Sequence, residues 1–258
     1  MPSVDVLRHP DAKALAESVA GRLITTLVER IAASGGAHVC LTGGGIGTAV
    51  LAAVAASPGH DAVDWSHVDI WWGDERYLPE GDADRNETSA RRALLDHVRI
   101  PVDRVHAIPG PWASDSDVEK AAAMYASELA QAARPEDHSP VPSMDVLLLG
   151  IGPDGHVASL FPEHPALHDD RSVAAVHGSP KPPPTRVTMT LPTLNAARET
   201  WILASGAEKA KAVRLALDEG AGVLQIPAAG VRGRERTLFC LDEAAAGDLP
   251  PTLGRPSA

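Results

Sequence analysis

The chain has 258 residues, of which 44% are hydrophobic, so it is long enough to bury a large core. Its formal net charge of -11 argues against a general nucleic-acid binder, although a local group of cations can still bind a small anion. The sequence shows no basic-then-apolar leader and no apolar run of membrane-spanning length. We therefore expect a cytoplasmic protein without a nucleic-acid or membrane partner, either a monomer or a weak homo-oligomer.

Apolar strand-like runs alternate with alanine-rich helical segments along the chain. We predict strands at Val4–Leu7, Ala37–Leu41, Val68–Trp72, Arg104–Ile108, Met144–Leu149, Arg186–Leu191, Trp201–Ala204 and Arg236–Leu241. We predict helices at Asp11–Ile31, Ile46–Ala56, Thr88–Val98, Ser114–Ala133, Leu194–Ala197 and Ala207–Asp218.

This alternation predicts an α/β fold. It is typical of a Rossmann-like, doubly wound and mostly parallel sheet with helices on both faces. We expect a single domain over residues 1–258, with a tail that frays from about Gly247 because its composition is rich in Pro and Gly. Cys40 and Cys240 lie in apolar runs, which predicts buried free thiols and not a disulfide or a metal set.

The stretch Met144–Pro162 carries the strongest functional signal. A strand buried on both faces ends in glycines, which are followed by Asp154 and His156. Ligands of open α/β sheets bind beyond the carboxyl ends of the strands, so His156 is placed where chemistry usually occurs. The same residues can also be explained as a turn in which Asp154 caps the next segment. The pattern alone leaves both explanations open.

A glycine turn, Thr42-Gly43-Gly44-Gly45, follows the strand Ala37–Leu41 and opens a helix. Exposed backbone N–H groups and the positive end of a helix dipole favour an anion there, although glycines needed only for close packing would look the same. Neither the dinucleotide fingerprint nor the P-loop pattern is met. The sequence therefore favours a phosphate group over a nucleotide cofactor.

Two further regions supply charged candidates. Asp74-Glu75-Arg76 follows the strand Val68–Trp72 and offers an acid or base beside an anion clamp, or a solvated turn ion pair. Arg186 and Lys209 are candidate phosphate partners, and Lys209 is equally explained as a solvated surface lysine.

Histidines near Glu163 give no metal signal. The spacing of Glu163, His164 and His168 matches no standard ligand set, and Pro165 breaks helical geometry. We predict no metal site.

Together these blocks resemble the 6-phosphogluconolactonase family, within the group that includes glucosamine-6-phosphate deaminase. The matching blocks occur in family order over nearly the whole chain: Leu41-Thr42-Gly43-Gly44, Trp72-Gly73-Asp74-Glu75-Arg76, Gly150–Pro162 and Arg186-Val187-Thr188-Met189-Thr190. The resemblance implies hydrolysis of 6-phospho-D-glucono-1,5-lactone, a phosphorylated sugar lactone, without an organic cofactor.

The resemblance also implies residue roles. His156 would be the general base, and Arg76 would contact the lactone end or the phosphate. Gly43, Gly44, Arg186 and Lys209 would hold the phosphate, with Thr42 and Gly45 in the same turn. From the chemistry of the site, we expect the Asp154 carboxylate to fix the loop or the imidazole tautomer, and we count Asp74 among the catalytic residues.

Two rival functions remain. A deaminase would use Asp74 as a proton shuttle, but that branch has an aromatic residue where this chain has Arg76. A sugar-phosphate sensor without catalytic activity would keep the phosphate cradle and usually carries a helix-turn-helix, for which one helix before Ala37 leaves no room. Both points favour the lactonase.

Overall fold

The computed structural model describes residues 3–112, 117–218 and 220–256. Its main element is a seven-stranded sheet with the order β10-β1-β9-β8-β5-β2-β3, in which every neighbouring pair is parallel. The strands are β1 (Ser3–His9), β2 (Ala37–Leu41), β3 (Val68–Trp72), β5 (Val146–Gly150), β8 (Glu199–Ala204), β9 (Arg236–Asp242) and β10 (Arg255–Pro256). This arrangement confirms the predicted doubly wound, mostly parallel sheet.

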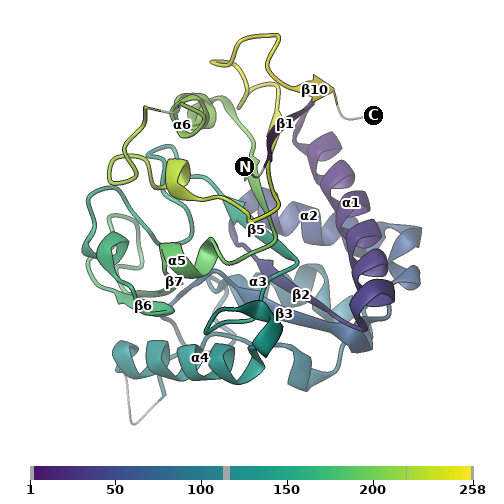
Figure 1. Ribbon diagram of the computed structural model, residues 1–258, viewed down its shortest axis with the longest axis vertical. Coiled ribbons are helices and arrows are strands. Elements are labelled where there is room, and N and C mark those ends of the chain that lie inside the picture. Colours follow the sequence, from purple (N-terminus) through teal and green to yellow (C-terminus); the bar gives the residue numbers. More distant parts are fainter. Residues whose placement is uncertain (1–2, 113–116, 219, 257–258) are drawn as a thin grey trace.

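The helices flank this sheet on both sides. Figure 1 shows α1 and α2 on one side and α5 and α6 on the other. They are α1 (Ala12–Ser34), α2 (Gly44–Ala56), α3 (Asn86–Ala93), α4 (Val118–Ala132), α5 (Leu191–Leu194) and α6 (Ala210–Ala216). Short 3-10 helices lie at Pro58–Ala62, Trp65–His67, Leu95–His97, Val102–Arg104, Pro135–Asp137, Pro165–His168, Ala207–Lys209 and Pro227–Gly230.

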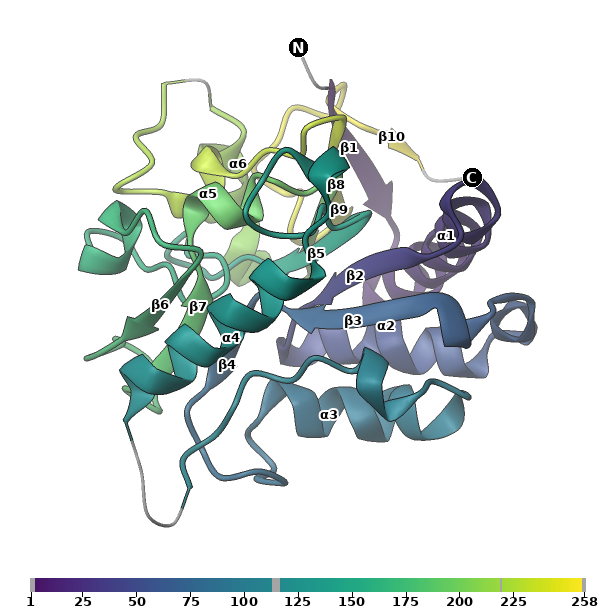
Figure 2. The same ribbon diagram turned by 60° about the horizontal axis from the view of Figure 1, so that its bottom comes forward.

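A smaller antiparallel sheet was not predicted. It has the order β4-β7-β6 and packs next to α4 (Figure 2). Its strands are β4 (Asp74–Arg76), β6 (Val173–Val176) and β7 (Arg186–Met189). The residues of β4 contain no apolar alternation, so only their pairing with β7 makes them a strand.

The ends of α1 follow the sequence signals. Asp11 caps the helix by accepting a hydrogen bond from the backbone N–H of Ala14 at 2.8 Å. Gly35 ends it with φ of 78°, a left-handed conformation that favours glycine. The apolar residues spaced by four, from Leu15 to Leu27, are buried.

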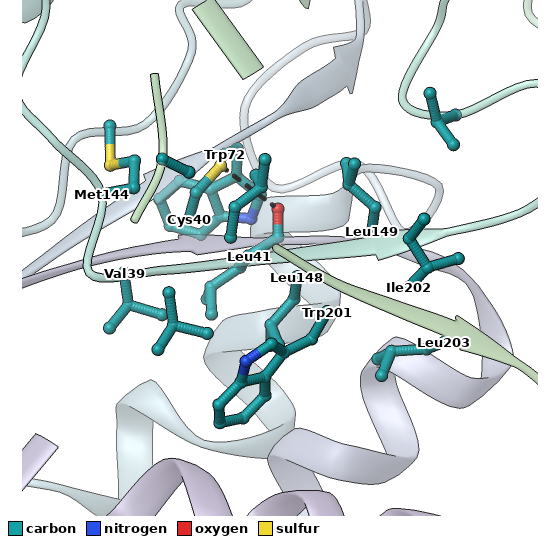
Figure 3. Close-up of a cluster of buried hydrophobic side chains, with 14 of the residues drawn as sticks. Val39, Cys40, Leu41, Trp72, Met144, Leu148, Leu149, Trp201, Ile202 and Leu203 are labelled. Carbon is teal, nitrogen blue, oxygen red and sulfur yellow. Dashed lines mark hydrogen bonds between the residues drawn. The ribbon is translucent and has the colours of Figure 1, made fainter. Parts of the chain in front are cut away.

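The core lies on both faces of the central strands. Figure 3 shows Cys40 and Leu149 on one side of the strands and Leu148 and Trp201 on the other. Because successive side chains of a strand point to opposite faces, a strand buried on both faces must be apolar at every position. This is why β5 reads as a continuous apolar run. Both cysteines are free and buried, as expected.

The strand order places a switch point between β2 and β5. From β2 the chain moves outward to β3, and it then returns to β5 on the opposite side of β2. The connections after β2 and β5 therefore diverge, and a crevice opens at their carboxyl ends. The glycine turn and the His156 loop begin at these two ends.

Several predicted boundaries were wrong. Residues 104–108 form no strand: Val105 makes one isolated bridge to Ile70, and the N–H of Ala107 turns back to the Val105 carbonyl at 3.2 Å. The short helix predicted at Leu194–Ala197 instead spans Leu191–Leu194. The predicted start of α4 at Ser114 lies outside the described residues, and Asp117 caps the helix.

Residues 247–256, where fraying is predicted, make contacts with β1 and with the side chain of Arg8. The backbone of β10 pairs with β1, with Leu7 opposite Arg255. The Arg8 guanidinium donates to the carbonyls of Pro250 at 3.1 Å and Leu253 at 3.0 Å. A distant side chain thus satisfies carbonyls that composition alone leaves without partners.

Candidate active site

A polar cavity of about 610 Å³ lies at the carboxyl edge of the large sheet, over the switch point. It is bordered by the ends of β2, β5 and β8 and by the small sheet. Nine of the ten predicted site residues line it: Thr42, Gly43, Gly44, Gly45, Asp74, Arg76, His156, Arg186 and Lys209. The tenth, Asp154, contacts His156.

A tight turn after β5 presents His156 to the cavity. The N–H of Gly152 donates to the His156 carbonyl at 2.9 Å, and Gly155 adopts φ of 84°. The imidazole Nδ1 lies 2.5 Å from Oδ1 of Asp154. A Cβ at Gly152 would lie 1.9 Å from Nδ1, so only glycine leaves room for this pair. The Phe161 ring packs on the imidazole with centroids 4.6 Å apart.

The Asp154 carboxylate is strongly stabilised in its charged form. Burial alone would raise its pKa, but the hydrogen bond with His156 and the charges of His156 and Lys181 lower the pKa well below its usual range. An ionised carboxylate can only accept a hydrogen bond, so the contact with Asp154 favours the tautomer that carries its proton on Nδ1 and leaves Nε2 of His156 as the basic nitrogen.

The glycine turn opens α2 at the other side of the switch point. Gly43 is the N-cap residue, and Gly44 has φ of 79°. A Cβ at Gly43 would lie 1.9 Å from Oδ1 of Asn86, so glycine permits the close approach of this side chain. The first turn of α2 contains no acidic residue, and its backbone N–H groups carry the positive end of the helix dipole.

Asp74 and Glu75 differ in their surroundings although they are adjacent. Asp74 lines the cavity and accepts hydrogen bonds from Oγ of Ser159 at 2.6 Å and Nδ2 of Asn86 at 3.4 Å. The Glu75 carboxylate accepts backbone N–H bonds from Asn86 at 2.7 Å and Glu87 at 2.8 Å, which caps α3. Burial raises the pKa of Glu75 to about 7, partly offset by the charge of Arg85. Asp74 therefore faces the cavity, whereas Glu75 holds the start of α3.

Three predicted cations reach the cavity in different ways. The Arg76 guanidinium is held by the Asp84 carbonyl, 2.5 Å from Nη1. Arg186 is 5% exposed and stacks over the Phe161 ring at 5.6 Å. Lys209 ends a 3-10 turn before α6, and its ammonium group makes no hydrogen bond or ion pair within the described part of the chain. Burial, followed by the nearby charge of Lys181, lowers the pKa of Lys209.

Sequence reasoning missed three residues of this site. Lys181 comes from the proline-rich segment 179–184 and reaches the His156 pair, and Asn86 and Ser159 hold Asp74. Ser159 lies within the motif after β5, and its burial beside Asp74 follows from the approach of β4 to that loop. No local pattern marks Lys181 or Asn86, because their roles depend on contacts across the fold.

The sheet, its switch point and the polar cavity define a Rossmann-like α/β protein with a ligand site at the carboxyl edge. The chain belongs to the family of glucosamine-6-phosphate isomerases and 6-phosphogluconolactonases, whose model matches residues 10–240. No helix within the described ranges is long and apolar enough to span a membrane.

Three similar proteins place the chain within this family. It is 58% identical over 254 residues to the 6-phosphogluconolactonase of Streptomyces coelicolor, in an alignment that covers 97% of this chain and 96% of the relative. It is 47% identical to that of Mycobacterium tuberculosis, over 93% of this chain and 96% of the relative. The solved 6-phosphogluconolactonase of Trypanosoma brucei superposes with a TM-score of 0.80 at 26% identity, over 97% and 99% of the two chains.

Proposed function

We propose that this protein hydrolyses 6-phospho-D-glucono-1,5-lactone to 6-phosphogluconate, as the names of its relatives indicate for them. The observation that carries the proposal is the His156–Asp154 pair, in which Nδ1 and Oδ1 lie 2.5 Å apart. The pair faces a cavity that is also lined by the N-terminus of α2 and by cationic side chains. A phosphorylated lactone needs this combination, because one end of the substrate is an anion and the other an activated ester.

His156 acts as the general base. Asp154 holds the Nδ1 proton, so Nε2 accepts a proton from a water molecule as its oxygen attacks the lactone carbonyl carbon. The tetrahedral intermediate collapses when the bond between this carbon and the ring oxygen breaks. The imidazolium of His156 returns its proton to the ring oxygen, and the product acid loses its own proton to solvent.

Backbone N–H groups and cationic side chains bind the phosphate and the oxyanion of the substrate. The backbone N–H groups of Gly43, Gly44 and Gly45 bind the phosphate together with Arg186 and Lys209. Arg76, oriented by the Asp84 carbonyl, donates to the oxyanion or to the phosphate.

Two polar residues complete the proposed site. Thr42 begins the glycine turn and lines the cavity beside the proposed phosphate site. Asp74 accepts a hydrogen bond from a substrate hydroxyl while Ser159 and Asn86 hold its carboxylate. The proposed reaction needs no metal or organic cofactor. We further propose that the protein is a cytoplasmic monomer or weak homo-oligomer without nucleic-acid or membrane partners.

The test is the hydrolysis of freshly generated lactone, coupled to 6-phosphogluconate dehydrogenase and corrected for spontaneous opening. We expect His156→Ala to lower kcat/KM by about 10³-fold, within the range of general-base catalysis. The matched control is His168→Ala, because His168 is an exposed histidine in a neighbouring turn. No acceleration by the folded wild type overturns the function, and full activity of His156→Ala overturns the mechanism.

A further inference from the structure

Lys181 lies behind the catalytic imidazole, on the side opposite the basic nitrogen. Its Nζ is 3.4 Å from Nδ1 of His156 and 3.7 Å from Oδ1 of Asp154. The side chain lines the cavity and is 41% exposed, so it is neither a buried structural cation nor a freely solvated one. The imidazole therefore contacts one anion and one cation at the same ring nitrogen.

Arg186 fixes the backbone that carries Lys181. Its Nη2 donates to the carbonyls of Lys181 at 3.1 Å and Pro182 at 3.0 Å, and its Nε donates to that of Pro183 at 3.2 Å. The Ser179 hydroxyl also donates to the Lys181 carbonyl at 2.9 Å. Prolines restrict this segment further. These hydrogen bonds and the prolines hold the backbone of Lys181 in one position beside the His156–Asp154 pair.

We propose that Lys181 is a positioning residue for lactone hydrolysis, whose ammonium group balances the charge of Asp154 and keeps the His156 imidazole neutral. This inference rests on the proposed function. With Asp154 alone, the anion would favour the imidazolium, which cannot accept a proton from water. The cation offsets that effect before the reaction and helps the imidazolium release its proton to the leaving ring oxygen afterwards.

The other charged groups around the cavity do not duplicate this contact. Within the described residues, Lys181 is the one cation within hydrogen-bond distance of the imidazole. Its charge also lowers the pKa of Lys209. The charged groups facing His156 across the cavity are Asp74 and Arg76 from β4, Arg186 from β7, and Glu208 and Lys209 from the turn before α6.

The test compares pH profiles of kcat/KM between about pH 5 and 7.5 for Lys181→Met and Lys181→Arg. We expect Lys181→Met to move the acid limb to higher pH by about one unit, which is about a tenfold loss of kcat/KM below that limb. Lys181→Arg keeps the charge and the wild-type profile. Lys211→Met is the control, because Lys211 is exposed on α6 and outside the cavity lining.

A second readout is independent of activity. The NMR titration of the His156 ring proton, assigned by its loss in His156→Gln, has a higher midpoint in Lys181→Met than in the wild type. A raised KM with unchanged profile and midpoint overturns the inference, as does an equal shift in Lys211→Met. If the wild type fails to hydrolyse the lactone, the proposed function falls, while the NMR titration still decides whether Lys181 balances the charge.

Discussion

The hydroxyl of Thr42 accepts a hydrogen bond from the backbone N–H of Gly150 at 3.2 Å. This bond joins the first residue after β2 to the last residue of β5, so it crosses the switch point of the sheet. A hydroxyl can accept one hydrogen bond and still donate another. Thr42 therefore links the glycine turn to the His156 loop, and its hydroxyl can still donate a hydrogen bond to a ligand.

Replacing Thr42 tests this link. Thr42→Val keeps the shape but removes the acceptor, so Gly150 loses its partner and the free energy of unfolding falls by about 1 kcal/mol. We also expect a several-fold higher KM for the lactone. Thr42→Ser retains the hydroxyl and serves as the control in thermal unfolding and kinetics. Equal behaviour of the two variants would show that the bond is unimportant.

Substitution of Gly152 tests the space required by the His156–Asp154 pair. The Cβ of Gly152→Ala would lie 1.9 Å from Nδ1 of His156, so the imidazole must move. Because displacement by about 1 Å can cost about 10²-fold, we expect at least such a loss in kcat. Gly21→Ala in α1 is the control, since open space surrounds that position. Wild-type kcat in Gly152→Ala would show that the imidazole keeps its catalytic position beside a Cβ.

Substitution of Asp154 tests whether its carboxylate selects the imidazole tautomer of His156. Asp154→Asn preserves the shape but replaces the anionic acceptor of the imidazole proton, so we expect kcat/KM to fall by about 10³-fold. Asp170→Asn, at an exposed position, should leave the rate unchanged. The coupled lactonase assay measures both variants. Unchanged activity of Asp154→Asn would remove this carboxylate from the mechanism.

Substitution of Lys209 tests its proposed contact with the substrate phosphate. Its ammonium group has no hydrogen-bond partner among the described residues, so it is available to a ligand. Lys209→Met should raise KM about tenfold, which corresponds to about 1.4 kcal/mol of binding, and change kcat less. Inorganic phosphate should also inhibit the variant less strongly than the wild type. A selective loss of kcat would instead place Lys209 at the lactone end.

The raised pKa of His106 predicts how the free energy of unfolding depends on pH. Burial lowers its pKa, but hydrogen bonds with Asp69 at 3.0 Å and Glu128 at 2.7 Å raise it more, to about 9 from the ordinary 6.5. Because the folded pKa is raised, this contribution is complete below pH 6.5 and is lost as pH rises through 9.

Thermal unfolding between about pH 6 and 9.5 measures this effect. His106→Gln should be less stable than the wild type at the acid end of this range, and the difference should shrink toward the alkaline end. The exposed residue His168 gives the control variant His168→Gln. A difference that is constant with pH would rule out the charged His106 as its cause.

The sequence predicted the large sheet because its strands carry local signals. β2 and β3 have the predicted bounds, since short, mostly apolar runs that end at glycine turns are typical of strands buried on both faces. The small sheet was missed because β4 consists of three charged residues, which become a strand only by pairing with β7. Pairing between segments that lie far apart along the chain leaves no local pattern.

The sequence by itself determined the chemical groups of the candidate site. Strand ends, glycines and charged residues are local, and their order along the chain placed His156, the glycine turn and Arg76 at one edge of the sheet. Only the tertiary structure decided how these groups are used. It turned Glu75 into a helix cap, braced Lys181 against Arg186 and placed that lysine beside His156. These outcomes depend on distances across the fold, which burial and hydrogen bonding fix and which no spacing in the sequence contains.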